Sequence, residues 1–434
     1  MLAQDAVRRP VRTLVTVFAA WKLFLFLVAA GSTLGPAYDT SASITLDAAN
    51  PSNSSAPVLL ARLTSWDAIY FTQVARRGYL FEQEWAFGSG LTIAIQYLVK
   101  VFTSLGIQNR GHLESAAGVL VANVSHLLSA LVLESLGRVI TGDNRVALVA
   151  ALLHVFSPAG LFLSAPYAEA PFALLSFLGY LLYAKSCVTR RPLARDAQII
   201  LAGVLFGVAT TFRSNGISHG VPFAWEFIQH LLTLPRRPLP AIRRLIPLGM
   251  GGICVAAGSV VPQFIAYRRF CDPAASVQRP WCHGRLGSIY AFVQVHYWDN
   301  GLFRYWKLSN IPLFLLAAPM LYVLARSGIA QLVSKGNTAK GPKSERHERA
   351  AWLVQSAAAA QVILALLTLT SHHVQIITRM ASGYPLWYLW LAGWLARGDK
   401  AVPKGGFSGN GFVVFMVMYA SIQAVLFASF LPPA

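Results

Sequence analysis

Long apolar segments recur along this 434-residue chain and constrain its fold more than any other feature. A helix needs about 20 predominantly apolar residues to cross a bilayer. The sequence therefore predicts an all-α polytopic membrane bundle of about eleven transmembrane helices. The segments lie at about residues 14–34, 114–136, 146–164, 168–186, 197–213, 216–234, 245–267, 309–326, 351–371, 379–396 and 409–430. Charged residues make up only 12% of the chain, against roughly 25% in soluble domains.

The formal net charge of +19 does not indicate a nucleic-acid partner, because the basic residues lie in short connections between apolar segments. There they set the topology, since cytosolic loops are enriched in Lys and Arg. Arg8, Arg9 and Arg12 predict a cytosolic N-terminus, and eleven crossings then place the C-terminus in the lumen. The other predicted cytosolic connections contain Arg138 and Arg145, Arg190–Arg195, Arg236–Arg244, residues 326–349 and Arg397–Lys404.

On this topology, residues 1–434 form a single integral membrane domain whose first luminal segment is residues 35–113. This segment contains a glycosylation sequon at Asn53, usable only in the lumen. It also contains the apolar run Leu91–Ser104, which is too short to cross the bilayer and predicts a helix at the luminal surface.

Three further features follow from the same topology. Residues 269–308 form a second luminal segment, and its Cys271 and Cys282 are expected to form a disulfide in the oxidising lumen. Residues 327–350 are polar and rich in Gly and Lys, and predict a disordered cytosolic linker. Lys22 lies inside the first crossing and is expected to snorkel or to face other helices.

The stretch Ser65–Gly90 is the longest polar run near the N-terminus, and it carries Asp67 beside Trp66. Carboxylates held between apolar helices at a membrane surface are costly to place, so they indicate a functional site. Taken alone, Asp67 is equally compatible with the start of an amphipathic surface helix, where an acidic residue is favourable.

Other polar residues fall on the same predicted luminal side. One carboxylate near several cations suits a reaction in which a lipid phosphate leaves, because the Arg fork binds phosphate and a carboxylate activates an acceptor hydroxyl. The alternatives are a helix start at Glu169, interfacial snorkelling of the Arg residues, and an aromatic belt around residue 298. The candidates are Glu82, Gln83, Tyr167, Glu169, Arg213, Asn215, His296, Trp298, Arg304 and Arg379.

Several stretches of the chain resemble the GPI mannosyltransferase 2 (PIG-V) family. They occur in the family's order over most of the chain, and together they are specific. Gly88–Gly90 departs from the Phe-Pro-Gly usual in the family, which affects the loop shape there but removes no ionisable group. The matching stretches are Trp66–Phe71, Gly78–Gln83, Ser157–Pro158, Ser164–Glu169, Arg213–Gly216, His296–Trp298 and Gly301–Leu321.

The resemblance implies a GT-C-type helical bundle in the endoplasmic reticulum membrane, with its active site in luminal loops. It implies α1,6 transfer of mannose from dolichyl phosphate mannose onto the first mannose of a GPI precursor. Asp67 is then the catalytic acidic residue, acting as a single general base in an inverting displacement. Neither a metal nor another cofactor is expected, because Arg residues neutralise the leaving phosphate.

Fungal members of the family work with a small membrane partner subunit, which the resemblance extends to this chain. Two other classes of function remain open at this stage. A transporter or scramblase of lipid-linked sugars also uses interrupted helices and intramembrane charges, although here the polar residues gather on one face. A non-catalytic subunit of a transferase complex is the reading that remains if Asp67 is structural.

Overall fold

The computed structural model describes residues 2–48, 57–109, 111–271, 279–284, 287–333, 345–397 and 408–432. Within these ranges the chain forms helices and turns without a strand, which confirms the predicted all-α polytopic bundle. Eight of the described helices are long and apolar enough to cross a membrane. They are α2 (Pro10–Gly31), α7 (Leu113–Thr141), α9 (Glu169–Val188), α10 (Pro192–Phe212), α12 (Pro238–Phe270), α14 (Ile311–Val333), α15 (Glu345–Ser371) and α18 (Gly409–Ala428).

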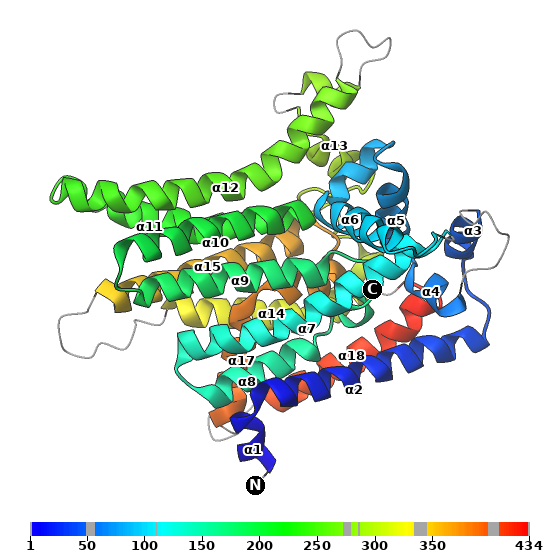
Figure 1. The fold of residues 1–434 in the computed structure, drawn as a ribbon, viewed down its shortest axis with the longest axis horizontal. Coiled ribbons are helices and arrows are strands. Elements are labelled where there is room, and N and C mark those ends of the chain that lie inside the picture. The colour runs from blue at the N-terminus through cyan, green and yellow to red at the C-terminus, as the bar shows by residue number, and fades with distance from the viewer. Residues whose placement is uncertain are drawn as a thin grey trace.

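The other three predicted crossings are interrupted segments rather than long helices. Proline explains two of them, since the residue before Pro disfavours α conformation and Pro lacks a backbone donor. Pro158 lies within the first segment, just after its longer helix ends, and Pro385 begins the last helix of the third segment. The short helices lie among the long ones in Figure 1. The three segments are α8 (Asn144–Val155) with η3 (Gly160–Leu163), η4 (Ser214–His219) with α11 (Gly220–Thr233), and α16 (Ile377–Met380), η8 (Ala381–Gly383) and α17 (Pro385–Arg397).

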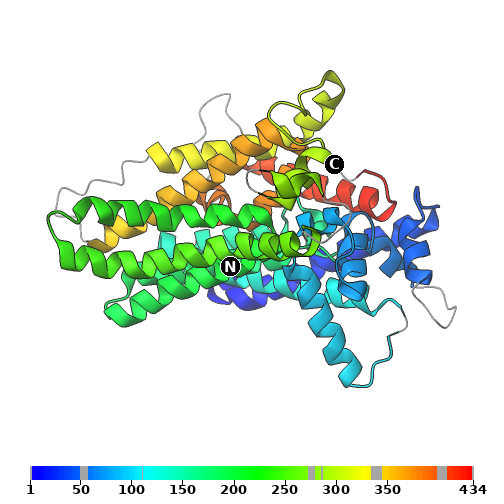
Figure 2. The ribbon, with the colours of Figure 1, turned by 90° about the horizontal axis from the view of Figure 1, so that it is seen from above.

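The bundle has two distinct ends, seen right and left in Figure 1 and again from above in Figure 2. The right end, here the Asp67 end, gathers the short helices that follow α2 and α12. The turns after α7, α9 and α11 lie at the opposite end. The short helices are α3 (Ser41–Asp47), α4 (Val58–Leu63), α5 (Asp67–Arg77), η2 (Glu82–Phe87), α6 (Gly90–Ser104) and α13 (Ile289–His296).

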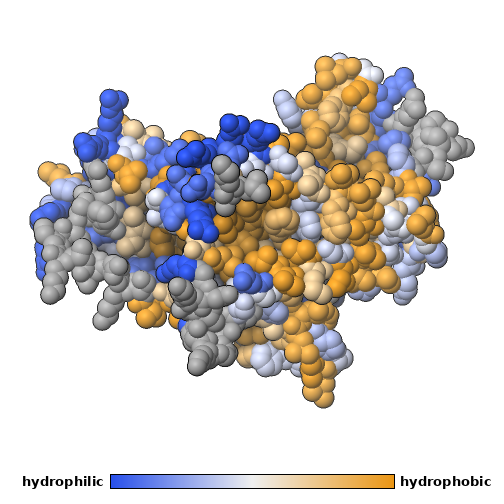
Figure 3. Space-filling view, turned by 90° about the horizontal axis from the view of Figure 1, so that it is seen from below, coloured by the Kyte–Doolittle hydropathy of each residue, from blue (hydrophilic) through white to orange (hydrophobic). Residues whose placement is uncertain are grey.

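The distribution of hydrophilic residues on the surface also distinguishes the two ends of the bundle. In Figure 3 the strongly hydrophilic residues on the visible face concentrate in the left half, away from the Asp67 end. Helix α6 projects from the body of the bundle in Figure 2. With 15 residues it is too short to cross a bilayer, as predicted for this run. Its Leu91 and Ile95 are buried, whereas Ile93 and Tyr97 are exposed, so its outer face is apolar.

The predicted linker over residues 327–350 is wrong at both of its ends. Helix α14 continues to Val333 and α15 already begins at Glu345. The cause in α15 is Arg349, which is buried and pairs with Glu226 at 2.6 Å, so its charge is satisfied inside the bundle. Residues 334–344, like the sequon at Asn53, lie outside the described residues.

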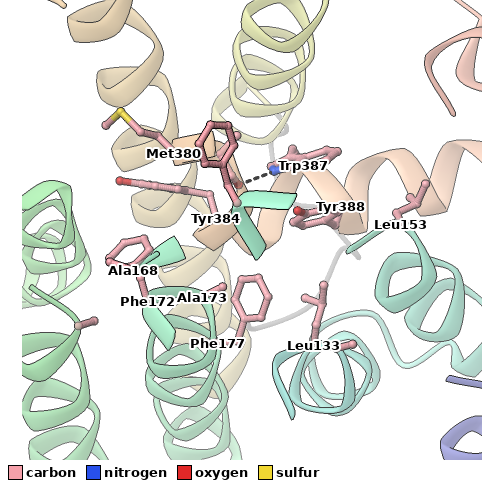
Figure 4. Close-up of a cluster of buried hydrophobic side chains, with 14 of the residues drawn as sticks. Leu133, Leu153, Ala168, Phe172, Ala173, Phe177, Met380, Tyr384, Trp387 and Tyr388 are labelled. Atoms are coloured by element: carbon pink, nitrogen blue, oxygen red, sulfur yellow. Dashed lines mark hydrogen bonds between the residues drawn. The ribbon is translucent and has the colours of Figure 1, made fainter. Parts of the chain in front are cut away.

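A core of buried aromatic side chains joins the first turns of α9 to those of the α17 segment. Figure 4 shows Phe172 and Phe177 of α9 facing Tyr384, Trp387 and Tyr388 of the α17 segment. All five rings are buried. Lipid is as apolar as these side chains, so close packing holds them together in a membrane. The core therefore fixes the two backbone segments that carry the polar residues described below.

A smaller apolar group at the Asp67 end, here the Trp281 cluster, joins η2, α12 and α13. Its buried members are Trp85, Ala266, Trp281, Ile289 and Val293. Beside them, a disulfide links Cys271, at the end of α12, to Cys282 in η5 (Pro280–His283), with the Cα atoms 5.5 Å apart. This is the pairing expected from the sequence.

Alkylation should find Cys271 and Cys282 blocked in protein denatured without reductant, and both free after reduction. Closing a loop of sequence separation 11 restricts the unfolded chain, which stabilises the Trp281 cluster by about 3 kcal/mol. Cys187 and Cys254 are free thiols and serve as the internal control. Labelling of all four cysteines without reductant would contradict the disulfide.

Candidate functional site

Asp67 is the first residue of α5, and the backbone turns sharply just before it. Trp66 has a φ of 60°, which a bulky side chain rarely adopts, and such strained residues are enriched at functional sites. The Asp67 backbone N–H donates to the phenol oxygen of Tyr167 at 3.0 Å. The Asp67 side chain is 34% exposed, so its carboxylate is open to a substrate.

Tyr167 holds this turn in place through both sides of its hydroxyl group. Its oxygen accepts from Asp67, and its O–H donates to the Ser65 carbonyl at 3.3 Å. Burial raises the pKa of the Tyr167 phenol well above its ordinary value, and the nearby Asp67 carboxylate raises it further. The phenol therefore stays protonated at neutral pH, and both hydrogen bonds persist.

Glu169 begins α9, and its carboxylate is fully buried. One oxygen, Oε1, accepts from Arg213 Nη1 at 2.5 Å and from Arg379 Nε at 2.8 Å. A buried carboxylate is tolerated only when it is paired in this way. Glu169 thus orients two guanidinium groups from inside the bundle, while its Oε2 has no hydrogen-bond partner in the described part of the chain.

Arg379 connects the two carboxylates. Its Nη2 lies 3.3 Å from Asp67 Oδ2, while its Nε binds Glu169. The guanidinium carbon also lies over two aromatic rings, 4.1 Å from the Phe162 centroid and 4.9 Å from that of Tyr167. A desolvated cation over aromatic faces gains about 2 kcal/mol or more. The two rings therefore help to hold the Arg379 guanidinium in its position next to Asp67.

Arg213 is held from its other side by the segment that follows α10. Its Nε donates to Asn215 Oδ1 at 3.3 Å. Asn215 in turn donates to the Tyr384 hydroxyl at 3.4 Å. The predicted residues Arg213 and Asn215 therefore belong to the same site as Glu169, although 44 residues separate Arg213 from Glu169 in the sequence.

Asp67, Glu169, Arg213 and Arg379 form what we call the carboxylate–arginine cluster, with two groups of each charge. Its links differ in strength. The Asp67–Arg379 contacts, at 3.3 and 3.4 Å, are longer than the two contacts to Glu169. Asp67 is also the more exposed carboxylate. The ion pair between Asp67 and Arg379 is therefore the weakest link of the cluster.

Glu82 lies in a different environment from the cluster. Its Oε1 accepts from Trp281 Nε1 at 2.7 Å and its Oε2 from the Tyr297 hydroxyl at 3.4 Å, with Arg279 3.5 Å away. Trp281 belongs to the Trp281 cluster, and within the described ranges Glu82 has no hydrogen bond or ion pair with the four charged residues above. The neighbouring Gln83 is half-buried. A substrate-binding role for Glu82 and Gln83 stays a prediction.

Glu82→Gln is expected to loosen the Trp281 cluster and to leave the carboxylate–arginine cluster intact. The amide keeps the Trp281 hydrogen bond but loses the 3.5 Å ion pair with Arg279, whose half-exposed side chain limits the contribution of the pair to about 1 kcal/mol. Proteolysis between α12 and α13 should quicken slightly, with the catalytic rate within a few-fold of wild type. A rate loss as large as that of a cluster variant would place Glu82 at the substrate.

The remaining predicted residues lie near the Trp281 cluster or on the surface. His296 is exposed and stacks on Phe292 at 4.9 Å. The Trp298 ring meets Phe87 edge-on at 5.2 Å. Arg304 is exposed and pairs with Asp299 at 3.3 Å. Their substrate contacts stay predictions, since none of these partners belongs to the carboxylate–arginine cluster.

Sequence reasoning missed Phe162. It lies in an apolar run, where nothing distinguishes it from its neighbours. It becomes part of the site because the turn η3, after Pro158, brings its ring against Arg379.

Residues 13–434 match the family described as Mannosyltransferase (PIG-V). GPI mannosyltransferase 2 of Chaetomium globosum is 52% identical, covering 98% of this chain and 96% of that relative. GPI mannosyltransferase 2 of Gibberella zeae is 44% identical and covers 99% of both chains. Among solved structures, ArnT from Cupriavidus metallidurans bound to undecaprenyl phosphate has a TM-score of 0.43 and 14% identity, over 94% of this chain and 71% of that one.

Proposed function

Because the chain belongs to the mannosyltransferase (PIG-V) family, we propose that it adds the second mannose, in α1,6 linkage, to a mono-mannosylated GPI precursor. The proposed donor is dolichyl phosphate mannose, and the proposed site of action is the luminal face of the endoplasmic reticulum membrane. The observation that supports this most is the carboxylate–arginine cluster, in which an accessible carboxylate lies beside two guanidinium groups.

The proposed reaction is a single inverting displacement. The donor mannose is β-linked to phosphate and the product is α-linked, so one attack by the acceptor 6-hydroxyl suffices. The new C–O bond forms as the bond to phosphate breaks, and its electron pair leaves on the phosphate oxygen. Asp67 takes the hydroxyl proton, and no second carboxylate is required.

The two arginines have different proposed roles. Arg379 binds the donor phosphate and releases Asp67 from its ion pair as the phosphate arrives, which couples donor binding to the appearance of the base. Arg213 holds Glu169 so that the buried carboxylate keeps Arg379 in place. Because the guanidinium groups neutralise the leaving phosphate, the scheme needs no metal.

The direct test is mannose transfer by purified protein with labelled dolichyl phosphate mannose and a one-mannose GPI acceptor in detergent or nanodiscs. Transfer sensitive to an α1,6-mannosidase supports the proposal. Movement of the labelled lipid across a liposome membrane without transfer would indicate a scramblase. Transfer that appears only after a second membrane protein is added would indicate dependence on a partner subunit.

The proposed orientation puts the Asp67 end in the lumen and the N-terminus in the cytosol. The basic connections at the other end of the bundle support this through the positive-inside rule. Reporters inserted after Arg195, in α10 near its basic start, and after Arg349 should both report a cytosolic location. A luminal signal at either position would contradict the orientation and the placement of Arg213 and Arg379 in the lumen.

A further inference from the structure

Lys22 is buried within the bundle instead of snorkelling to a surface. Its side chain lies on α2 and is only 5% exposed. Its Nζ donates to Ser164 Oγ at 2.6 Å and to the Leu163 carbonyl at 3.1 Å. Throughout the described ranges it forms no ion pair with a carboxylate, so its donors serve only this one segment.

Two more polar side chains from membrane helices bind the same segment. Asn123 of α7 donates to the Ser164 carbonyl at 3.0 Å. Gln423 of α18 accepts from the Leu161 backbone N–H at 2.9 Å. We call Lys22, Asn123 and Gln423 the polar clamp. Three separate helices thus direct polar side chains, of which Lys22 and Gln423 are buried and Asn123 is half-buried, to the backbone or side chains of Leu161–Ser164.

Stability alone does not account for a lysine at this place. An ionisable side chain such as that of Lys22 inside a membrane helix is costly and generally marks a functional position. Methionine would fill much of the same volume in α2 without that cost. Irregular backbone at membrane depth does need partners for its polar groups, but neutral side chains such as Asn123 and Gln423 already supply that kind of partner.

The clamped segment carries the aromatic surface under Arg379. Phe162 lies between the clamped residues Leu161 and Leu163, and its ring is 4.1 Å from the guanidinium carbon. Tyr167, three residues after Ser164, supplies the second ring and the hydrogen bond to the Asp67 backbone. A shift of this segment therefore moves Arg379 relative to Asp67.

We propose that the polar clamp is a positioning device for mannose transfer, in which Lys22 fixes Leu161–Ser164 and thereby the Arg379 guanidinium beside Asp67. Lys22 touches neither substrate and acts only through this segment. The expected effect on turnover rests on the proposed function, whereas the positioning of Leu161–Ser164 by Lys22 rests on the structure.

Lys22→Met tests both parts. Hydrogen–deuterium exchange should quicken in peptides covering residues 160–168, with other peptides unchanged. Turnover should fall by about 10-fold to 100-fold, since a displacement near 1 Å at a reacting group costs up to about 10²-fold. Leu25→Ala is the matched control on the same helix: it removes a buried apolar side chain, lowers thermal stability, and should leave both local exchange and turnover near wild type.

A double-variant cycle separates positioning from general destabilisation. If Lys22 acts through Phe162, then Phe162→Leu should add little to the turnover loss already caused by Lys22→Met, whereas independent effects would multiply. Gln423→Leu, on α18, should reproduce the local exchange change and replaces Lys22→Met if that variant fails to fold.

The outcomes distinguish this inference from the function beneath it. Unchanged exchange over residues 160–168 in both Lys22→Met and Gln423→Leu overturns the clamp, whatever the enzyme activity. Quicker exchange with wild-type turnover, or multiplicative losses in the cycle, overturns the positioning role. Wild-type protein that transfers no mannose overturns the proposed function, and the positioning role with it, while the exchange result still decides the clamp.

Discussion

Asp67→Asn should leave the protein folded and able to bind both lipids, yet remove nearly all mannose transfer. Asn keeps the size of Asp and its backbone hydrogen bond to Tyr167, but it cannot accept a proton from the acceptor hydroxyl. Removing a general base typically costs 10²–10⁴ in rate. The measurement is single-turnover transfer at saturating donor, which reports the chemical step and not lipid binding.

Asp67 is the better candidate for the base than Glu169 on geometry. Its carboxylate is 34% exposed, whereas that of Glu169 is fully buried and accepts from two arginines. Glu169→Gln should therefore act mainly by releasing Arg213 and Arg379, with a fall in stability alongside the fall in rate. If Asp67→Asn keeps more than about a tenth of wild-type turnover, less than the loss expected for a base, Asp67 is a helix-start residue and Glu169 becomes the next candidate.

The bundle was predictable because hydropathy alone dictates which segments enter a membrane. Helix continuity was less predictable. The crossing expected at residues 146–164 is a 12-residue helix followed by the turn η3, because Pro158 interrupts it and the polar clamp satisfies the backbone beyond. A hydropathy pattern contains no information on partners that lie 141 residues away, as Lys22 and Leu163 do.

The members of the site were predictable as polar residues on one predicted side of the membrane, helped by the family resemblance. Their pairing was not. Nothing in the sequence indicates that Arg213 and Arg379 converge on the same oxygen of Glu169, since 44 and 210 residues separate them from it. The same holds for Arg349, which the sequence places in a polar linker but which pairs with Glu226 in the interior of the bundle.

Arg379→Lys should reduce turnover by about 10²-fold or more, the loss found when one preorganised donor to a developing negative charge is removed. A lysine has one compact head group and cannot bind Glu169 Oε1, contact Asp67 and present a flat face to Phe162 at once. Donor KM should rise as well, because the proposed phosphate contact is lost. Arg213→Lys is the matched control. Arg213 has no contact with Asp67, so its rate loss should be smaller.

Comparing Arg379→Met with the double variant that adds Glu169→Gln then distinguishes a structural role of Arg379 from a role in phosphate binding. Arg379→Met alone leaves Glu169 with one cation in place of two, and should lower the thermal stability of the protein, because removing one partner of a buried pair is destabilising. Adding Glu169→Gln removes the excess buried charge and should restore much of that stability. Turnover should stay near the Arg379→Met level, because neither replacement binds phosphate. If stability and turnover recover together, Arg379 serves only to neutralise Glu169, and the donor phosphate must be bound elsewhere.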